Sequence, residues 1–447
     1  MGLNTSSKSS FLQLASVIYL IILNLIINAD VGLDVPLMVE IGRKYDKTEL
    51  DFSLFVIVPF TILTGIFSFL WGYLSDKYQR KKILLFNILF GALSLACVGG
   101  ALNFSLPFSL VAFFRVLSAV GLSGIIPVSM SMVVDLISEH RRGMVFGWMG
   151  IAGYAGYGLG FLLSGILIKF GLHLPYLVGA SIGVGFFLLG LLVPEPARAQ
   201  GEDLLRELIQ KEEFSYSYRI EAKALKQIFS MPLNLWLFGF VLLFSIPGSA
   251  LGIFFIPFLV RNHSFNEFWA TLYLLAVFSS QVFGQVVFGR VGDLWYQKNQ
   301  RGRAWTMLAT ILLSLPFLLL AFGLDFDLKQ LPHLLGFSVL LLLGGFFMVG
   351  SNPLTLTVFC DINLPEHRGT VLALNYIGWL VARIISAPLC SGLAEKWGMN
   401  YAPAFFIICL LLIPSGFLLL PVLWQIIPAL EEKSQLLKSR LQPLNEN

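Results

Sequence analysis

Long apolar runs of similar length alternate with short polar stretches along almost the whole chain. A helix of roughly 20 apolar residues crosses the ~30 Å hydrocarbon core of a membrane. The pattern therefore predicts an all-α membrane protein with twelve spanning helices. The predicted spans are residues 12–36, 51–74, 83–102, 107–134, 144–168, 174–193, 233–258, 268–291, 304–323, 333–359, 370–394 and 401–426.

Composition supports a membrane protein and argues against several other classes. Hydrophobic residues make up 57% of the chain and charged residues 13%, whereas a soluble domain carries about 25% charged residues. The four cysteines lie in apolar runs without the spacing of a metal or redox site. Walker and H-E-x-x-H motifs are absent from the sequence. We therefore predict no enzyme activity, no metal and no cofactor; the net charge of +4 comes from loops, so nucleic acid is not an expected partner.

The polar segment 194–231 divides the predicted spans into two sets of six. The predicted organisation is an N-terminal bundle (1–193), a cytoplasmic linker (194–231), a C-terminal bundle (232–428) and a cytoplasmic tail (429–447). With the N-terminus inside, 21 of the 30 Lys and Arg residues lie in inward-facing segments and seven in outward-facing loops. Because basic residues concentrate in cytoplasmic loops, both termini are predicted to be cytoplasmic, in a cell (inner) membrane.

An internal repeat relates the two sets of spans. The stretch "GIIPVSMSMVVDLISEHRRG" (124–143) recurs 226 residues later as "GSNPLTLTVFCDINLPEHRG" (350–369). Gly72 and Asp76 likewise recur as Gly289 and Asp293, 217 residues later. Both copies of each motif fall on the predicted cytoplasmic side. Two six-helix bundles in parallel orientation follow from this arrangement.

The stretch "WGYLSDKYQRKK" (71–82) resembles the signature loop G-x-x-x-D-[RK]-x-G-R-[RK] of the major facilitator superfamily. Gln79 replaces the second glycine of that signature, and the copy at Gly289 keeps fewer basic residues. The resemblance covers nearly the whole chain and implies secondary transport by alternating access. A weaker resemblance, from Arg115 to Asp135, is to spinster-like lipid transporters, although Leu122 stands where they carry an acid.

The repeated motifs predict a conformational gate. We expect Asp76 to face the helix N-terminus near Gly369, and Asp293 to face the one near Gly143, because a helix N-terminus favours negative charge. The basic residues of these loops have an alternative role as topology determinants and lipid-phosphate contacts. The predicted gate residues are Gly72, Asp76, Arg80, Gly289, Asp293, Asp135, Arg142, Asp361 and Arg368.

Charged residues inside spans predict a substrate site, because such groups normally face a cavity or a partner. Asp30 and Arg115 are expected to pair, either as a static pair or as a proton-coupling switch, with Asp34 nearer the surface and solvated. Arg383 lies near mid-membrane and would attract an anionic substrate, or else bind backbone carbonyls. The predicted substrate-binding residues are Arg383, Arg115, Asp30, Tyr157, Gln281, Gln285 and Asn375.

Together these features predict a monomeric secondary transporter for a small organic solute, anionic or amphipathic, driven by a proton or ion gradient. Its expected partners are the solute, protons and membrane lipids. The glycines of span 144–168 are expected to pack tightly between the two halves, as in antiporters of the family. A lipid or drug exporter of the same fold, and a receptor or scaffold that transports nothing, remain as alternatives.

Overall fold

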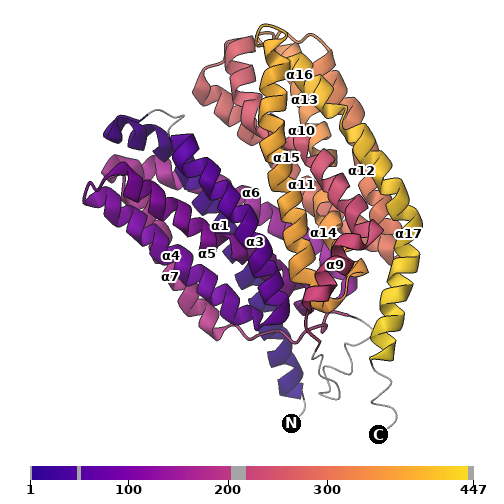
Figure 1. The fold of residues 1–447 in the computed structure, drawn as a ribbon. Helices are drawn as coiled ribbons and strands as arrows, with labels where there is room; N and C mark the ends of the chain where they lie inside the picture. The colour runs from indigo at the N-terminus through magenta and orange to yellow at the C-terminus, as the bar shows by residue number, and fades with distance from the viewer. Residues whose placement is uncertain (1–2, 48–51, 203–217, 441–447) are drawn as a thin grey trace. The chain divides into compact units, whose positions relative to one another are not determined.

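A computed structural model describes residues 3–47, 52–202 and 218–440, and these residues form an all-α fold (Figure 1). Eleven helices of this described part are long and apolar enough to cross a membrane. The remaining predicted span corresponds to α11 (Glu267–Lys298), which is as long as its neighbour α10 but carries Gln281, Gln285 and Asp293. The predicted all-α membrane fold is confirmed.

Two compact units make up the chain, and each draws a short segment from the other half of the sequence. The first unit comprises residues 1–139, 152–221 and 365–373. Its helices are α1 (Leu3–Tyr45), a π-helical turn (Ser53–Ile57), α3 (Val58–Lys77), α4 (Arg80–Asn103), α5 (Phe108–Leu136), most of α6 (Arg142–Leu167) and α7 (Leu174–Leu192).

The second unit comprises residues 140–151, 222–364 and 374–447. Besides α11, its helices are α9 (Ala222–Ser230), α10 (Pro232–His263), α12 (Gly302–Gly323), α13 (Leu331–Met348), α14 (Ser351–Ile362), most of α15 (Arg368–Glu395), α16 (Tyr401–Cys409) and α17 (Leu412–Ser439). The predicted linker thus contains one short helix, α9, while residues 203–217 lie outside the described part. The predicted tail begins inside α17.

Two predicted spans are each divided into two helices, and proline explains both breaks. Proline removes the hydrogen bond to the carbonyl four residues earlier and clashes with it. Pro353 stands four residues after Val349, which separates α13 from α14. Pro414 stands four residues after Leu410, which separates α16 from α17. Pro127, by contrast, lies inside the continuous helix α5.

The glycines of α6 pack on two different partners, which corrects their predicted role. A Cβ atom on Gly147 would approach the backbone of Gln285 in α11, within the second unit. A Cβ atom on Gly156 or Gly160 would instead collide with backbone carbonyls of α1, within the first unit. Only the first part of this glycine run therefore contacts the C-terminal half of the sequence.

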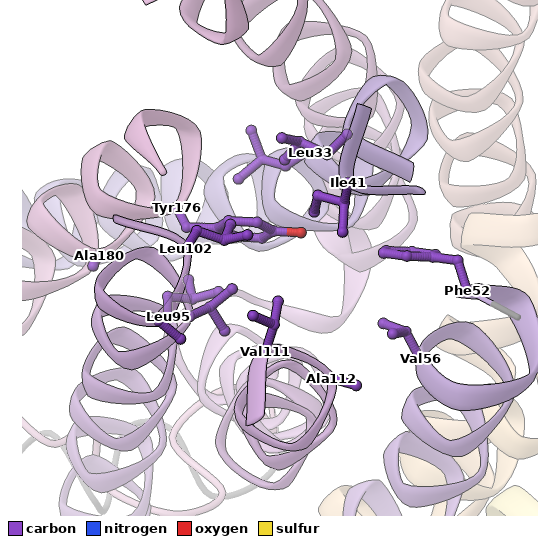
Figure 2. Close-up of a cluster of buried hydrophobic side chains, with 13 residues drawn as sticks. Leu33, Ile41, Phe52, Val56, Leu95, Leu102, Val111, Ala112, Tyr176 and Ala180 are labelled. Atoms are coloured by element: carbon purple, nitrogen blue, oxygen red, sulfur yellow. The ribbon is translucent and has the colours of Figure 1, made fainter. Parts of the chain in front are cut away.

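A buried apolar cluster in the first unit surrounds Tyr176 of α7 (Figure 2). Its other members come from α1, α4, α5, α7 and the segment before α3, and include Leu33, Leu95 and Phe52. Figure 2 shows the Tyr176 ring among these side chains, with its hydroxyl group pointing away from Ala180. The cluster therefore positions one polar atom inside an otherwise apolar region.

Candidate functional site

Asp76, the next-to-last residue of α3, caps the N-terminus of α15. One carboxylate oxygen accepts the backbone N–H of Gly369 at 2.8 Å, and the other accepts the N–H of Thr370 at 2.7 Å and its hydroxyl at 2.8 Å. Gly72 permits this approach, since a Cβ atom there would lie 2.6 Å from the carbonyl oxygen of Gly369. The contact expected from the sequence is therefore present, within the first unit.

Asp293 of α11 makes the equivalent contact with the start of α6. Its carboxylate accepts the backbone N–H groups of Gly143 at 3.2 Å and Met144 at 2.9 Å. Gly289 faces the backbone of Gly143, as Gly72 faces that of Gly369. Two carboxylates related by the repeat thus bind two helix N-termini, an arrangement favoured by the helix dipole.

Asp135, at the C-terminal end of α5, is the centre of a first ionic network, which comprises Asp135, Arg80 and Arg368 together with linker residues 195–202. Its carboxylate accepts hydrogen bonds from Arg368 at 2.7 Å and from Arg80. All three side chains are almost fully buried. Because removal of one partner would leave buried charge uncompensated, such a network holds its members firmly in place.

Asp361 of α14 is the centre of a second network with Arg142, Arg303 and Lys433. The carboxylate accepts from Arg142 at 3.1 Å and from Arg303, which also pairs with Asp293 at 2.7 Å. Arg303 was not among the predicted site residues. It corresponds in role to Arg80, but it stands ten residues after its motif aspartate instead of four. Because this spacing differs between the two copies, the repeat did not identify Arg303 from the sequence.

The first residues of the linker are built into the first network. The carboxylate of Glu195 accepts the N–H groups of Arg80 and Lys81, both at 2.9 Å, at the start of α4. Arg198 donates to the carbonyls of Ser75 at 2.6 Å and Tyr78 at 2.8 Å. Burial, aided by the nearby Arg80, lowers the pKa of Arg198 to about 10, so it stays protonated at neutral pH.

The linker also contacts the residues that hold α15. Ala199 is fully buried in the left-handed region with φ of 62°, and its N–H donates to Asp135 at 3.0 Å. Glu202 pairs with Arg368 and is 2% exposed. Residues 195–202, the linker strap, therefore contact several of the predicted gate residues, although their polar sequence had suggested only a cytoplasmic linker.

A buried ionic cluster joins α1, α5 and α7 in the first unit. Arg115 pairs with Asp30 at 2.9 Å, as expected, and with Asp34 at 2.8 Å. The hydroxyl of Tyr176 donates to Asp34 at 2.8 Å, and the Arg115 guanidinium lies 4.7 Å from the ring centroid of Phe60. The expectation that Asp34 is solvated was wrong, because α1 continues for eleven residues beyond it, to Tyr45.

Asp30 keeps one oxygen atom without a partner in this cluster. Its Oδ2 atom binds Arg115, while Oδ1 is buried and makes no hydrogen bond to any described residue. A buried carboxylate oxygen without a donor is costly, whereas a protonated carboxyl group needs no counter-charge. The cluster therefore offers one atom at which a proton can be held.

The other predicted substrate residues have surroundings different from those of this cluster. Arg383 is exposed, and its guanidinium lies 5.7 Å from the ring centroid of Trp379. Gln281 lines a small cavity with Phe255 and Leu318, and Gln285 is buried against Gly150. Among the described residues, no hydrogen bond or ion pair joins Arg383 to either glutamine or to Asn375. Tyr157 is 41% exposed.

The described residues hold no group of three or more His, Cys, Asp or Glu side chains that could bind a metal ion. A family model described as Major Facilitator Superfamily matches residues 10–295 and 249–444. The chain belongs to the major facilitator superfamily of membrane transporters. The transporter is thus an integral multi-pass membrane protein, and the prediction of a transporter rather than an enzyme is confirmed.

Sequence relatives of the transporter have different stated substrates. The "Proline/betaine transporter" of Salmonella typhimurium is 25% identical over 257 residues, covering 53% of this chain and 49% of the relative. "Quinidine resistance protein 1" of Saccharomyces cerevisiae is 28% identical over 168 residues, covering 36% and 28%. The chain spans about half the length, or less, of these curated relatives, so they leave the substrate open.

Solved structures resemble the transporter over almost its full length. The human organic anion transporter MFSD10 (TETRAN) superimposes with a TM-score of 0.68 at 19% identity, covering 92% of this chain and 99% of that one. The E. coli fucose:proton symporter FucP gives 0.67 at 15% identity, covering 91% and 97%. At these identities the likeness establishes the fold alone.

Proposed function

We propose that the transporter moves a small organic solute by alternating access and couples this movement to protons. The observation that carries the proposal is the cluster of two carboxylates around one guanidinium. If Asp30 and Asp34 are both ionised, Arg115 balances only one of them, which leaves one excess negative charge in a buried site. A proton on the free oxygen of Asp30 removes that excess.

Protonation of Asp30 would change what holds α1 to α5. Asp34 binds Arg115 and Tyr176 through hydrogen bonds that do not involve Asp30. A neutral Asp30, in contrast, attracts Arg115 less strongly, because the Coulombic part of the pair is lost. We infer that Asp30 is the titrating group and that Asp34 with Tyr176 is the fixed support of Arg115.

The gate that the proton would control consists of the two repeat-related contacts at Asp76 and Asp293. Each binds the N-terminus of a helix from the other sequence half, so each must break if the halves separate at this end. We further propose that both termini are cytoplasmic, that the transporter resides in a cell (inner) membrane and that it acts as a monomer. An organic anion is the favoured solute, since Arg383 carries an exposed positive charge within α15.

The test is solute movement in proteoliposomes with and without a pH gradient, starting with a panel of radiolabelled organic anions. The wild type is expected to accelerate net movement when a gradient is imposed. Asp30→Asn should abolish this acceleration but retain exchange of labelled for unlabelled solute, which needs no net proton transfer. Glu40→Gln, at an exposed ion pair on the same helix, is the matched control. An Asp30→Asn variant that still responds to the gradient would place proton coupling elsewhere.

Export of amphipathic compounds is a second candidate, favoured by similarity to the quinidine resistance protein and to the "Quinolone resistance protein NorA" of Staphylococcus aureus, which is 22% identical over 170 residues. The direction of the gradient separates the two functions. Coupled uptake requires an outside-acid gradient to increase accumulation on the cytoplasmic side. An exporter would instead lower accumulation on that side under the same gradient. No flux of any tested solute under either gradient would favour the receptor or scaffold.

A further inference from the structure

One face of α15 carries a cation beside two stacked aromatic rings. The rings of Tyr376 and Trp379 have centroids 6.0 Å apart and an interplanar angle of 16°. The guanidinium of Arg383 lies 5.7 Å from the Trp379 ring centroid. Trp379 is 39% exposed and Arg383 is exposed, so both side chains are accessible.

This face continues the one that meets α3 at the start of the helix. Tyr376 and Arg383 follow Gly369 at steps of seven residues, and seven residues make nearly two helical turns, so all three lie on one side of α15. Gly369 packs against Gly72 of α3. Gly378, which packs against Val241 of α10, lies on a different side of the helix. Tyr376 and Arg383 therefore lie on the side of α15 that carries Gly369 and not on the side of Gly378.

The repeat shows that these large side chains are not required by packing. At the offset of 226 residues, Tyr376 and Trp379 correspond to Gly150 and Gly153 in α6. Gly150 allows Gln285 to pack against the helix, and Gly153 lies next to Asn28. These two positions thus contact neighbouring side chains in one copy, and in the other they carry the partly buried ring of Tyr376 and the exposed ring of Trp379. The difference indicates a ligand-binding role for α15.

Arg383 also lies where an unpaired charge is costly. It stands fifteen residues after Arg368 and twelve before Glu395, near the middle of a candidate membrane span. Its guanidinium makes no ion pair with any described residue. A charge at this depth normally faces a partner or a watery space. We propose that Tyr376, Trp379 and Arg383 form a subsite for organic anions with a planar aromatic body, a proposal that rests on the proposed transport function.

Two chemical selections follow from this geometry. The guanidinium would bind a carboxylate or sulfonate through charge-assisted hydrogen bonds. The exposed face of Trp379 would stack against a flat ring but would fit a puckered saturated ring poorly. The subsite should therefore prefer an aromatic anion both to its neutral amide and to its saturated analogue.

The experiment is calorimetric titration of the purified full chain in nanodiscs with three probes: 1-naphthoate, decahydro-1-naphthoate and 1-naphthamide. Naphthoate is expected to bind about tenfold more tightly than either other probe, from the typical strengths of a charged hydrogen bond and a ring stack. Trp379→Leu should remove the preference over the saturated anion. Arg383→Gln should remove the preference over the amide, and Arg383→Lys should largely restore it.

Trp424→Leu is the matched control, because Trp424 is 70% exposed in α17 and should leave all three affinities unchanged. Each variant is first checked for a single monodisperse species and a wild-type unfolding temperature. Three results would overturn the subsite. The first is equal affinity for the aromatic and the saturated anion, and the second is unchanged naphthoate affinity in Trp379→Leu or Arg383→Gln. The third is that none of the probes binds. If these results coincide with gradient-driven flux of another solute, the proposed transport function stands. If naphthoate binds as expected without any such flux, the subsite stands and proton coupling fails.

Discussion

The two ionic networks at the ends of α5 and α14 make the same contacts with different supporting residues. In both, a motif aspartate caps a helix from the other sequence half, and a second aspartate binds two buried arginines. The first network is completed by the linker strap, which contributes Glu202 to Arg368. In the second network, Arg303 bridges both aspartates and Lys433 donates to the carbonyl of Asp361 at 2.9 Å.

The comparison shows that both copies of the repeat keep the contact between an aspartate and a helix N-terminus. The charged residues that surround this contact differ between the two copies. Asp293 shares Arg303 with Asp361, whereas the oxygens of Asp76 accept only from the start of α15 among the described residues. We therefore expect Asp76 to contribute to the stability of the fold mainly through its contact with the N-terminus of α15. The first network, in turn, includes the linker strap, whereas the second includes Lys433 of α17.

Loss of a central aspartate should have the largest effect and should be nearly equal in the two networks. Asp135→Asn and Asp361→Asn each leave two buried arginines without a full partner, so each should lower stability by about 3–5 kcal/mol. Thermal unfolding of the purified variants in detergent measures the loss. A large effect from one variant and none from the other would contradict the equivalence of the two networks.

The capping aspartates should differ from each other. Asp293→Asn weakens a charged hydrogen bond to Arg303 and should lower stability by about 1.5–3 kcal/mol. Asp76→Asn removes the charge at the start of α15, about 0.3–2 kcal/mol, and replaces one of two accepting oxygens with an NH2 group; it should in addition strongly reduce transport turnover while insertion stays near normal. Unfolding temperature and proteoliposome flux are measured side by side. Wild-type turnover in Asp76→Asn would refute its gating role.

The linker strap offers a change that affects the first network alone. A Cβ atom on Gly201 would collide with the carbonyl oxygens of Val134 and Ile137, so Gly201→Ala should displace the strap and lower stability by about 1–3 kcal/mol. Gly165→Ala is the control, because a Cβ atom there meets nothing within 4 Å. If both variants unfold at the wild-type temperature, the strap is not a working part of the network.

The smallest effect is expected outside both networks. Arg43 and Glu40 form an ion pair at 2.8 Å with side chains 72% and 38% exposed. Exposed pairs contribute about 0–1 kcal/mol, so Glu40→Gln should leave the unfolding temperature almost unchanged. A drop comparable to that of Asp135→Asn would show that burial does not distinguish the networks from surface pairs.

Much of the fold could be predicted because its signals are repetitive. Apolar runs locate the spans, and the repeated motifs locate Asp76 and Asp293 against the starts of α15 and α6. Helix breaks were harder to predict, since proline interrupts two spans but leaves α5 continuous at Pro127. Whether neighbouring contacts tolerate the lost hydrogen bond depends on packing, which one sequence does not reveal.

The site residues that were not predicted were missed for one reason. The spacing of residues along the sequence does not show which side chains the fold brings together. Arg303 is separated from Asp293 by a longer loop than the one before Arg80, and the fold brings it to the equivalent place. Asp34 was placed near the surface because the apolar run ends at residue 36, although the helix continues to Tyr45. Arg198 and Glu202 lie in a polar segment that was predicted only to be a cytoplasmic linker, and both are buried.

The central claim is that the contact between α3 and the start of α15 breaks in every transport cycle. A Cβ atom on Gly369 would touch the side chain of Ser75, so Ser75→Cys/Gly369→Cys in a background without native cysteines should form a disulfide. Asn234→Cys/Asn363→Cys, which joins α10 to the C-cap residue of α14 at a buried amide pair within one sequence half, is the control. We predict that oxidation of the first pair stops transport, that reduction restores it and that the control pair transports in both states; full transport by the oxidised first pair would contradict the account.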